Sequence, residues 1–276
     1  MPVVKVPHDG EINYEVKGEG PPVCLVTGLG GAMSWWKPQE AHFASRSKLI
    51  LHDHRGTGLS SKNVMKYSVG LLADDLIALL DHLEIEAAHF VGHSTGAAMT
   101  QEIALRHPDR ILSAVLSAGW PRADFLFQRS FEMRSAMLRD SGVEAYVKST
   151  ALFLFPPKWI ADNAEPLQAS EAAAIAAFPD PRIMQSRIEA ICAHSPGEAL
   201  RNMRCPTLVT CARDDILTPL YYSEEMARLI PNAAAYYFAD GGHAMSMTRA
   251  EEYNRVVGSF VDAAIAGKPW SSPQAS

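Results

Sequence analysis

Gly92-His93-Ser94-Thr95-Gly96 is the stretch of sequence that decides the fold. An apolar run precedes it and a helical pattern follows it, so we predict a sharp strand-to-helix turn centred on the serine. Only residues without a Cβ fit two positions to either side of so tight a turn, which explains both glycines. Such a turn raises the Ser94 hydroxyl above the sheet, at a helix N-terminus that favours negative charge. The alternative is a tight turn with an incidental serine; the place of the motif after the fifth predicted strand favours a nucleophile.

Short β-branched runs alternate with longer helical patterns on either side of this motif. The alternation is typical of a parallel sheet with crossover helices on both of its faces. His8-Asp9-Gly10 separates the first two runs and indicates an opening hairpin. We therefore predict an α/β fold with a mostly parallel, doubly wound sheet, whose strands are Val3–Val6, Ile12–Val16, Val23–Thr27, Lys48–His52, Ala88–Gly92, Ile111–Ala118, Thr207–Cys211 and Ala234–Phe238.

The alternation stops after the sixth predicted strand, where the chain becomes helical and rich in Ala, Phe, Met and Arg. An insertion of this size between two strands is too long for an ordinary loop. We predict that residues 120–203 form a helical cap over the carboxyl ends of the strands, where open α/β sheets bind ligands. The core then consists of residues 1–119 and 204–266, and the Pro- and Ser-containing tail 267–276 is expected to be disordered.

A serine hydroxyl attacks a carbonyl only when a base takes its proton, and that base needs a third group to orient it. His243 follows the last predicted strand in a glycine-flanked loop and is the predicted base among ten histidines. Asp214 and Asp215 follow an earlier strand, so the chain order is serine, acid, histidine. Both aspartates are candidates for the acid, and Asp124, just after the sixth strand, is a third.

Acyl transfer also requires hydrogen-bond donors aimed at the developing oxyanion. We assign one to the backbone N–H of Thr95 and the other to that of Leu29, in the loop Gly28-Leu29-Gly30-Gly31 after the third strand. Gly28 is expected to line the substrate site. A phosphate cradle is the alternative for this loop, but it lacks the Lys-Ser/Thr ending of a P-loop. We predict no cofactor.

The composition excludes several other classes of function. A net charge of −6 and no basic cluster argue against a nucleic-acid partner. No signal peptide and no apolar stretch long enough for a bilayer are present, so we expect a cytoplasmic protein without a membrane partner. The four cysteines fall at irregular spacings and predict no disulfide framework. His52 and His54 flank Asp53 without a third ligand, so no metal site is predicted, and the His93 side chain is expected to point away through the elbow.

These motifs together resemble the α/β-hydrolase superfamily over nearly the whole chain. In that superfamily the acid stands four residues before a proline, as Asp215 does before Pro219, so the resemblance favours Asp215 over Asp214. It also implies that the block after the fourth strand is a structural turn. The matching blocks are Thr27–Gly31, Asp53–Ser60, Gly92–Gly96, Asp214–Pro219 and Gly241–His243.

Smaller segments are similar to two families within this superfamily. Those that look like the aminoacrylate hydrolases of pyrimidine breakdown are Gly119-Trp120, Leu152–Pro156, Arg204–Pro206 and Gly241–Ala244, and Ser34–Gln39 is similar to 3-oxoadipate enol-lactonases. Both resemblances imply a small, carboxylate-bearing substrate. Thr27 departs from the histidine that many relatives have there, which alters hydrogen bonding around the oxyanion loop but not the backbone donor.

Hydrolysis of an ester, lactone or amide through a Ser94 acyl-enzyme is the leading hypothesis. A carbon–carbon bond hydrolase, a cofactor-free dioxygenase and a non-catalytic binding protein on the same fold are the alternatives, and a homo-oligomer is compatible with the sequence. Trp120 and Phe153 are predicted to wall the substrate pocket, although aromatic residues also pack a helical cap internally. Arg122 is the predicted carboxylate clamp, with two further candidates at Arg129 and Arg134.

Overall fold

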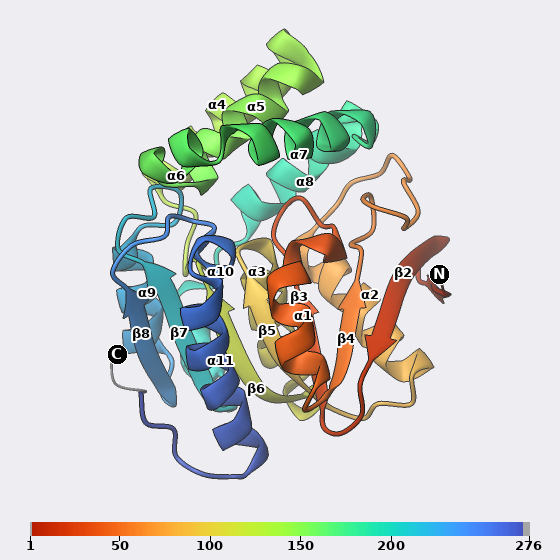
Figure 1. The fold of residues 1–276 in the computed structure, drawn as a ribbon. Helices are drawn as coiled ribbons and strands as arrows, with labels where there is room; N and C mark the ends of the chain where they lie inside the picture. The colour runs from red at the N-terminus through yellow and green to blue at the C-terminus, as the bar shows by residue number, and fades with distance from the viewer. Residues whose placement is uncertain (1, 273–276) are drawn as a thin grey trace.

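An eight-stranded sheet forms the centre of the molecule (Figure 1). The computed structural model describes residues 2–272. The strand order is β1-β2-β4-β3-β5-β6-β7-β8, with β2 antiparallel to both of its neighbours and all other pairs parallel. The strands are β1 (Val3–Val6), β2 (Gly10–Lys17), β3 (Pro22–Val26), β4 (Lys48–His52), β5 (Ala88–His93), β6 (Ile111–Ser117), β7 (Thr207–Ala212) and β8 (Ala233–Phe238). All lie within two residues of the predicted strands, and the predicted fold class is confirmed.

Helices cover both faces of this sheet (Figure 1). Helices α2, α3 and α9 pack on one face around a buried cluster that includes Leu76, and α1 and α11 pack on the other around Phe43 and Val257. The bounds are α1 (Lys37–Ala44), α2 (Val69–His82), α3 (Thr95–Arg106), α9 (Leu220–Leu229), α10 (Met245–Thr248) and α11 (Ala250–Ile265). Helix α1 is hard to predict from the sequence, because only two of its eight residues are buried and its apolar pattern is weak.

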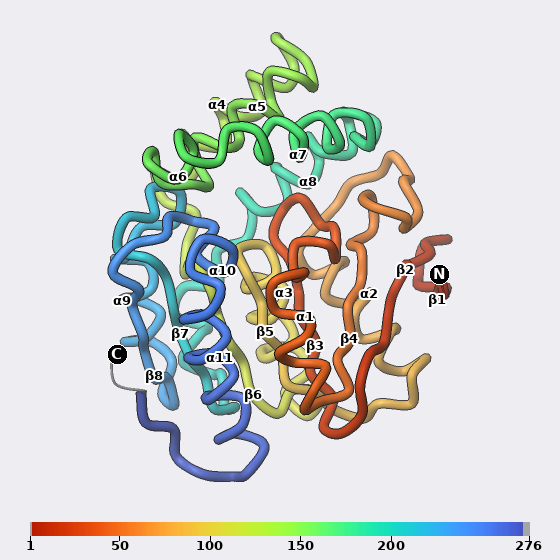
Figure 2. Tube along the Cα trace, viewed as in Figure 1, coloured from red at the N-terminus to blue at the C-terminus, as the bar shows by residue number. Residues whose placement is uncertain are grey.

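The insertion after β6 is helical and lies at one end of the molecule, beyond the carboxyl ends of the parallel strands (Figure 2). Its helices are α4 (Phe125–Ala136), α5 (Gly142–Leu154), α6 (Pro157–Asp162), α7 (Ala164–Ala176) and α8 (Pro181–Ala193). Helix α7 buries no residue, whereas α8 buries seven. Of these five helices, α8 therefore has a substantial buried face, and all five lie within residues 120–203, which we call the cap.

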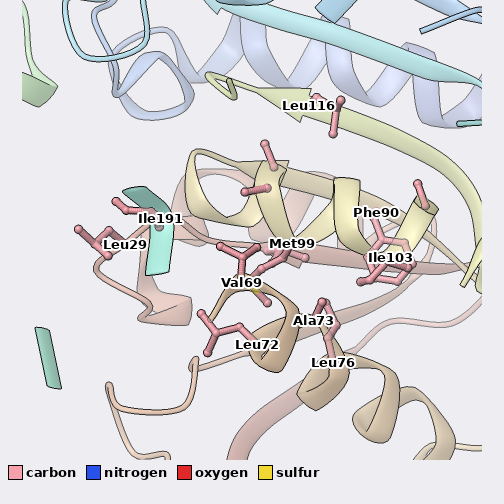
Figure 3. Packing of buried hydrophobic residues seen from close by; sticks show 14 of the residues in the cluster. Leu29, Val69, Leu72, Ala73, Leu76, Phe90, Met99, Ile103, Leu116 and Ile191 are labelled. Carbon is pink, nitrogen blue, oxygen red and sulfur yellow. The ribbon is translucent and has the colours of Figure 1, made fainter. Parts of the chain in front are cut away.

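Helix α8 and the loop after β3 share one buried apolar cluster (Figure 3). Leu29 of that loop and Ile191 of α8 lie close together, beside Val69 and Leu72 of α2 and Met99 of α3. Burial of side chains of this size stabilises the fold by about 1.5–3 kcal/mol each. The loop 28–31 is thus packed between the core helices and the cap.

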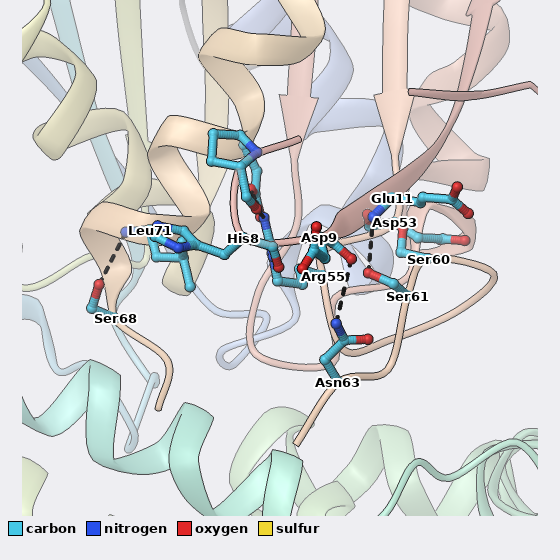
Figure 4. A network of polar contacts seen from close by, with 12 residues as sticks. His8, Asp9, Glu11, Asp53, Arg55, Ser60, Ser61, Asn63, Ser68 and Leu71 are labelled. Atoms are coloured by element: carbon cyan, nitrogen blue, oxygen red, sulfur yellow. Dashed lines mark hydrogen bonds and ion pairs between the residues drawn. The ribbon is translucent and has the colours of Figure 1, made fainter. Parts of the chain in front are cut away.

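The turn after β4 is held by a buried carboxylate (Figure 4). Asp53 accepts hydrogen bonds from the Met33 N–H at 2.8 Å, the Asn13 amide at 2.8 Å and the Leu59 N–H at 2.9 Å. Figure 4 shows Asp53 close to Glu11, whose N–H donates to Ser61 Oγ at 3.0 Å. Asp53 thus joins the turn to β2 and to the segment at Met33, in keeping with the structural role that the resemblance implied.

The described part of the predicted tail contacts the core. The Trp270 indole donates to Ser259 Oγ at 2.9 Å and its ring lies 5.9 Å from that of Phe260 on α11. The prediction of a disordered tail therefore does not describe residues 267–272. Residues 273–276, for which the same prediction was made, lie outside the described part of the chain.

Candidate active site

Ser94 lies at the tip of the turn between β5 and α3, with φ 55° and ψ −116°. A non-glycine residue in this region stores backbone strain of about 1–3 kcal/mol. The flanking glycines are sterically required: a Cβ on Gly92 would lie 2.3 Å from Gly96 O, and one on Gly96 would lie 2.0 Å from Val26 O. The two glycines thus allow β5 and α3 to approach closely, and the turn presents Ser94 at the cap end of the sheet.

His243 joins Ser94 to an acid. Its Nε2 lies 2.9 Å from Ser94 Oγ, and its Nδ1 lies 2.9 Å from Asp215 Oδ2. The acidic partner at Nδ1 assigns the proton to that nitrogen and leaves Nε2 free to accept from the serine. All three side chains are more than nine-tenths buried. The structure therefore brings the three residues named from the sequence into one hydrogen-bonded chain.

Asp215 is itself fixed by its surroundings. Oδ1 accepts hydrogen bonds from the Leu217 N–H at 2.8 Å and the Thr218 N–H at 2.9 Å, and Oδ2 accepts from the Thr218 hydroxyl at 2.8 Å. Asp215 can thus orient the imidazole and stabilise the cation that forms when His243 takes a proton.

The two competing aspartates have other partners. Asp214 accepts a hydrogen bond from the N–H of Gly242 at 2.8 Å, so it holds the loop that carries His243. Asp124 caps α4 by accepting from the Phe127 N–H at 3.1 Å, and it accepts a second bond from the Tyr221 hydroxyl at 2.7 Å. Neither one forms a hydrogen bond with His243.

Two backbone N–H groups beside Ser94 have no hydrogen-bond partner within residues 2–272. They belong to Leu29 and Thr95, the donors predicted from the sequence. The loop that carries Leu29 lies against Ser94, since a Cβ on Gly28 would come within 3.2 Å of Ser94 Cβ. Free N–H groups at this place can receive a negatively charged oxygen.

His93 lies beside the base rather than away from it. Its ring is 5.1 Å from that of His243 and stacks on Trp35 at 5.2 Å. Burial, and then the neighbouring His243, hold the pKa of His93 well below the usual histidine range. The expectation that this side chain points away is therefore wrong. The stacking partner Trp35 comes from a distant segment, so the motif around Ser94 does not reveal this contact. His93 is thus an uncharged wall of the site.

His52 and His54 are not joined by a third possible metal ligand among the described residues. Their rings stack 5.2 Å apart, and burial lowers the pKa of His52 to about 4. Within residues 2–272, no three His, Cys, Asp or Glu side chains are grouped in a way that could hold a metal ion. The pair is part of the buried turn after β4.

The predicted pocket residues lie in different environments. Trp120 is buried, and its indole donates to His194 O at 3.1 Å while its ring packs 4.6 Å from Phe127. Phe153 lies half-buried near the end of α5, just before Leu154, whose carbonyl accepts a hydrogen bond from the Ala244 N–H at 2.9 Å. The chain at Phe153 therefore runs close to the His243 loop, whereas Trp120 packs inside the protein.

The three candidate arginines differ in their partners. Arg122 is exposed and pairs with Glu225, and Arg129 is exposed with Glu132 3.5 Å away. Arg134 is buried and has no carboxylate partner within the described residues. Its Nη2 donates to the Tyr146 and Thr150 hydroxyls at 3.3 and 3.2 Å, and its Nε has no partner. Of the three candidates, Arg134 is thus the buried one, and one of its guanidinium donors has no partner among the described residues.

The chain belongs to the α/β-hydrolase fold family and is a hydrolase, since the profile of that family matches residues 21–250. Among named proteins, it is similar to RutD of Azorhizobium caulinodans, whose name proposes a carbamate hydrolase. The two are 39% identical over 252 residues, which cover 91% of this chain and 95% of that protein. The resemblance inferred from the motifs is confirmed.

Solved structures agree with this assignment. The enol-lactonase of Burkholderia xenovorans LB400 has a TM-score of 0.86 at 25% identity, covering 95% of this chain and 100% of that one. A meta-cleavage product hydrolase from Pseudomonas fluorescens IP01 has a TM-score of 0.81 at 22% identity, covering 96% and 98%. The second likeness shows the fold alone. No helix in residues 2–272 has the length and apolar character needed to span a membrane.

Proposed function

We propose that this protein is a serine hydrolase that cleaves a small, carboxylate-bearing ester, lactone or amide through a Ser94 acyl-enzyme. The observation that carries the proposal is the hydrogen-bonded chain from Ser94 Oγ through His243 to Asp215, with both distances at 2.9 Å. The name of the A. caulinodans relative points to a carbamate. A carbamate presents the same kind of electrophilic carbonyl and is included in the substrate class.

The proposed reaction begins when Ser94 Oγ attacks the carbonyl carbon and gives its proton to His243 Nε2. The carbonyl oxygen becomes an oxyanion, which accepts hydrogen bonds from the N–H groups of Leu29 and Thr95. Each such donor contributes about 2.7–4 kcal/mol of transition-state stabilisation. His243 then gives this proton to the leaving group as its bond to the carbonyl carbon breaks, which leaves the acyl-enzyme. A water molecule gives a proton to His243 Nε2 and attacks the acyl carbon, and the bond to Ser94 Oγ breaks as His243 returns a proton to that oxygen.

The carboxylate preference rests on Arg134. A buried cation without an anionic partner is costly, because its hydration is lost and only neutral hydroxyls replace it. The rings of Phe131, Tyr146 and Phe153 lie 5.2, 5.3 and 5.6 Å from its guanidinium and offset part of this cost. A substrate carboxylate would supply the missing anion, and Phe153 would then contact the bound substrate.

Substitution of the nucleophile tests the proposal. We expect Ser94→Ala to lower kcat by about 10³–10⁶ on every hydrolysed member of a panel of p-nitrophenyl esters, enol-lactones, carbamates and vinylogous dienones. A fluorophosphonate should label Ser94 in the wild-type protein, and Thr100→Ser, in the helix α3 that begins directly after Ser94, serves as a folded control. Hydrolysis undiminished in Ser94→Ala would refute the acyl-enzyme. Turnover of the dienones alone would indicate a carbon–carbon bond hydrolase, and oxygen uptake would indicate a dioxygenase.

A further inference from the structure

Arg187 is a buried cation that the sequence analysis did not single out. It lies on α8, is fully buried, and forms no ion pair within the described residues. Its Nη1 donates to Arg55 O at 2.7 Å, its Nη2 donates to Leu29 O at 2.9 Å, and Nη2 also lies 3.2 Å from His54 Nδ1. Burial lowers the pKa of Arg187 to about 10, so it is still charged at neutral pH.

Arg187 thereby joins the cap to the loop that carries a proposed oxyanion donor. The Gly31 N–H donates to Gly28 O at 3.0 Å, which makes residues 28–31 a β-turn. This bond fixes the peptide group between Gly28 and Leu29. The N–H of this peptide group belongs to Leu29 and faces the oxyanion in the proposed reaction. The next peptide, at the centre of the turn, has its carbonyl on Leu29, and Arg187 is the partner that holds that carbonyl.

The centre of this turn needs a fixed partner, because Gly30 has no side chain to restrict its backbone. Gly30 is exposed, and a Cβ on it would meet nothing within 4 Å. Its φ is not positive, so the turn is not type II; rotation of the central peptide would convert it to that type, which glycine permits. This rotation would break the hydrogen bond between Arg187 and the Leu29 carbonyl. It would also change the two dihedral angles beside the rotated peptide, the ψ of Leu29 and the φ of Gly30.

The packing around the guanidinium shows that the turn is shaped to receive it. Gly31 has φ +74°, and a Cβ there would lie 3.0 Å from Arg187 Nη2 and 2.4 Å from Thr57 Oγ1. The His54 N–H donates to Gly31 O at 2.8 Å, so the turn after β4 holds the other end of the loop. Arg187 therefore lies where the loop, the turn and α8 meet.

We infer that Arg187 is a positioning residue of the reaction: it holds the Leu29 carbonyl and thereby keeps the Leu29 N–H aligned for the oxyanion. This inference rests on the proposed acyl-enzyme function. The cap thus supplies part of the transition-state geometry as well as covering the site. A donor that is present but misaligned affects the transition state more than the bound substrate, so kcat should fall and KM should change little.

The test compares Arg187→Met with Ser186→Ala. Ser186 is the neighbouring residue on α8 and also joins the cap to the core, since its Oγ accepts from the Tyr67 N–H at 2.9 Å, but it does not contact the loop. For Arg187→Met we expect kcat on the best p-nitrophenyl ester to fall about 10- to 100-fold, KM to stay within about threefold, and phenylboronic acid to bind about 10-fold more weakly. For Ser186→Ala, kcat should stay within about threefold of the wild type.

Hydrogen exchange of residues 28–31 gives a readout that is independent of turnover. We expect faster exchange in Arg187→Met and wild-type exchange in Ser186→Ala. Equal kcat in the two variants, or a loss confined to KM, would overturn the inference. If Arg187→Met does not fold, Arg187→Lys decides: one ammonium cannot hold two carbonyls in the same way, so a wild-type kcat would also overturn it. Wild-type protein without Ser94-dependent turnover would instead refute the proposed function.

Discussion

Arg55 in the core and Arg134 in the cap are both buried cations, but only Arg55 faces a carboxylate. Arg55 Nε donates to Asp75 at 2.9 Å, and a second nitrogen of the same guanidinium contacts the other carboxylate oxygen. Two backbone carbonyls, of Pro7 and His8, accept its remaining donors. Arg134 has two hydroxyls and three aromatic rings instead. The buried arginine of the core is paired with a carboxylate, and the buried Arg134 of the cap is not.

The difference indicates that the core and the cap have different roles. In the core, His243 is hydrogen-bonded to Asp215 and Asp214 holds the His243 loop, so the groups that we propose to react are arranged without a ligand. In the cap, the buried Arg134 has no carboxylate partner among residues 2–272, and we propose that a substrate supplies one. We therefore expect substitutions in the core to affect chemistry and stability, and substitutions in the cap to affect the choice of substrate.

The largest expected effect separates the two adjacent aspartates of the core. Asp215→Asn should lower kcat by about 10⁴, because an amide cannot hold the required tautomer of His243 or stabilise its cation. Asp214→Asn should lower kcat by less than about 10-fold, since the amide oxygen can still accept from the Gly242 N–H. Steady-state kinetics on one ester measures both. Equal losses in the two variants would show that Asp214 shares the role that we give to Asp215.

The next effect compares the two arginines in stability. Arg55→Met should lower the free energy of unfolding by about 3–5 kcal/mol, because it leaves Asp75 buried without its partner. Burial already raises the pKa of Asp75 despite the bond to Arg55, so this carboxylate depends on that bond. Arg134→Met leaves no carboxylate behind and should cost about 1.5 kcal/mol or less. Urea unfolding measures both, and an equal cost would remove the contrast between core and cap.

The same contrast explains what the sequence could predict. The elbow, the strands and the order of Ser94, Asp215 and His243 follow from local rules: glycines at tight turns, periodicity, and strand ends that meet at one edge. The contacts of Arg134 depend on how α4 packs against α5, at separations of 12 and 16 residues, and those of Arg187 depend on how α8 comes to lie against a loop 158 residues before it. Helical periodicity marks a buried face without showing which loop it covers.

The smallest expected effect concerns substrate choice in the cap. Arg134→Met should raise KM for a carboxylate-bearing ester about 10- to 100-fold, since a charged hydrogen bond contributes about 1.5–3 kcal/mol. For the neutral methyl-ester analogue of the same substrate, KM should rise by a much smaller factor. Arg122→Met is the matched control, because Arg122 is exposed and already paired with Glu225. An equal rise in KM for both substrates would show that Arg134 supports the cap structure rather than binding the substrate carboxylate. An effect of Arg122→Met alone would show that Arg122, as predicted from the sequence, binds the carboxylate.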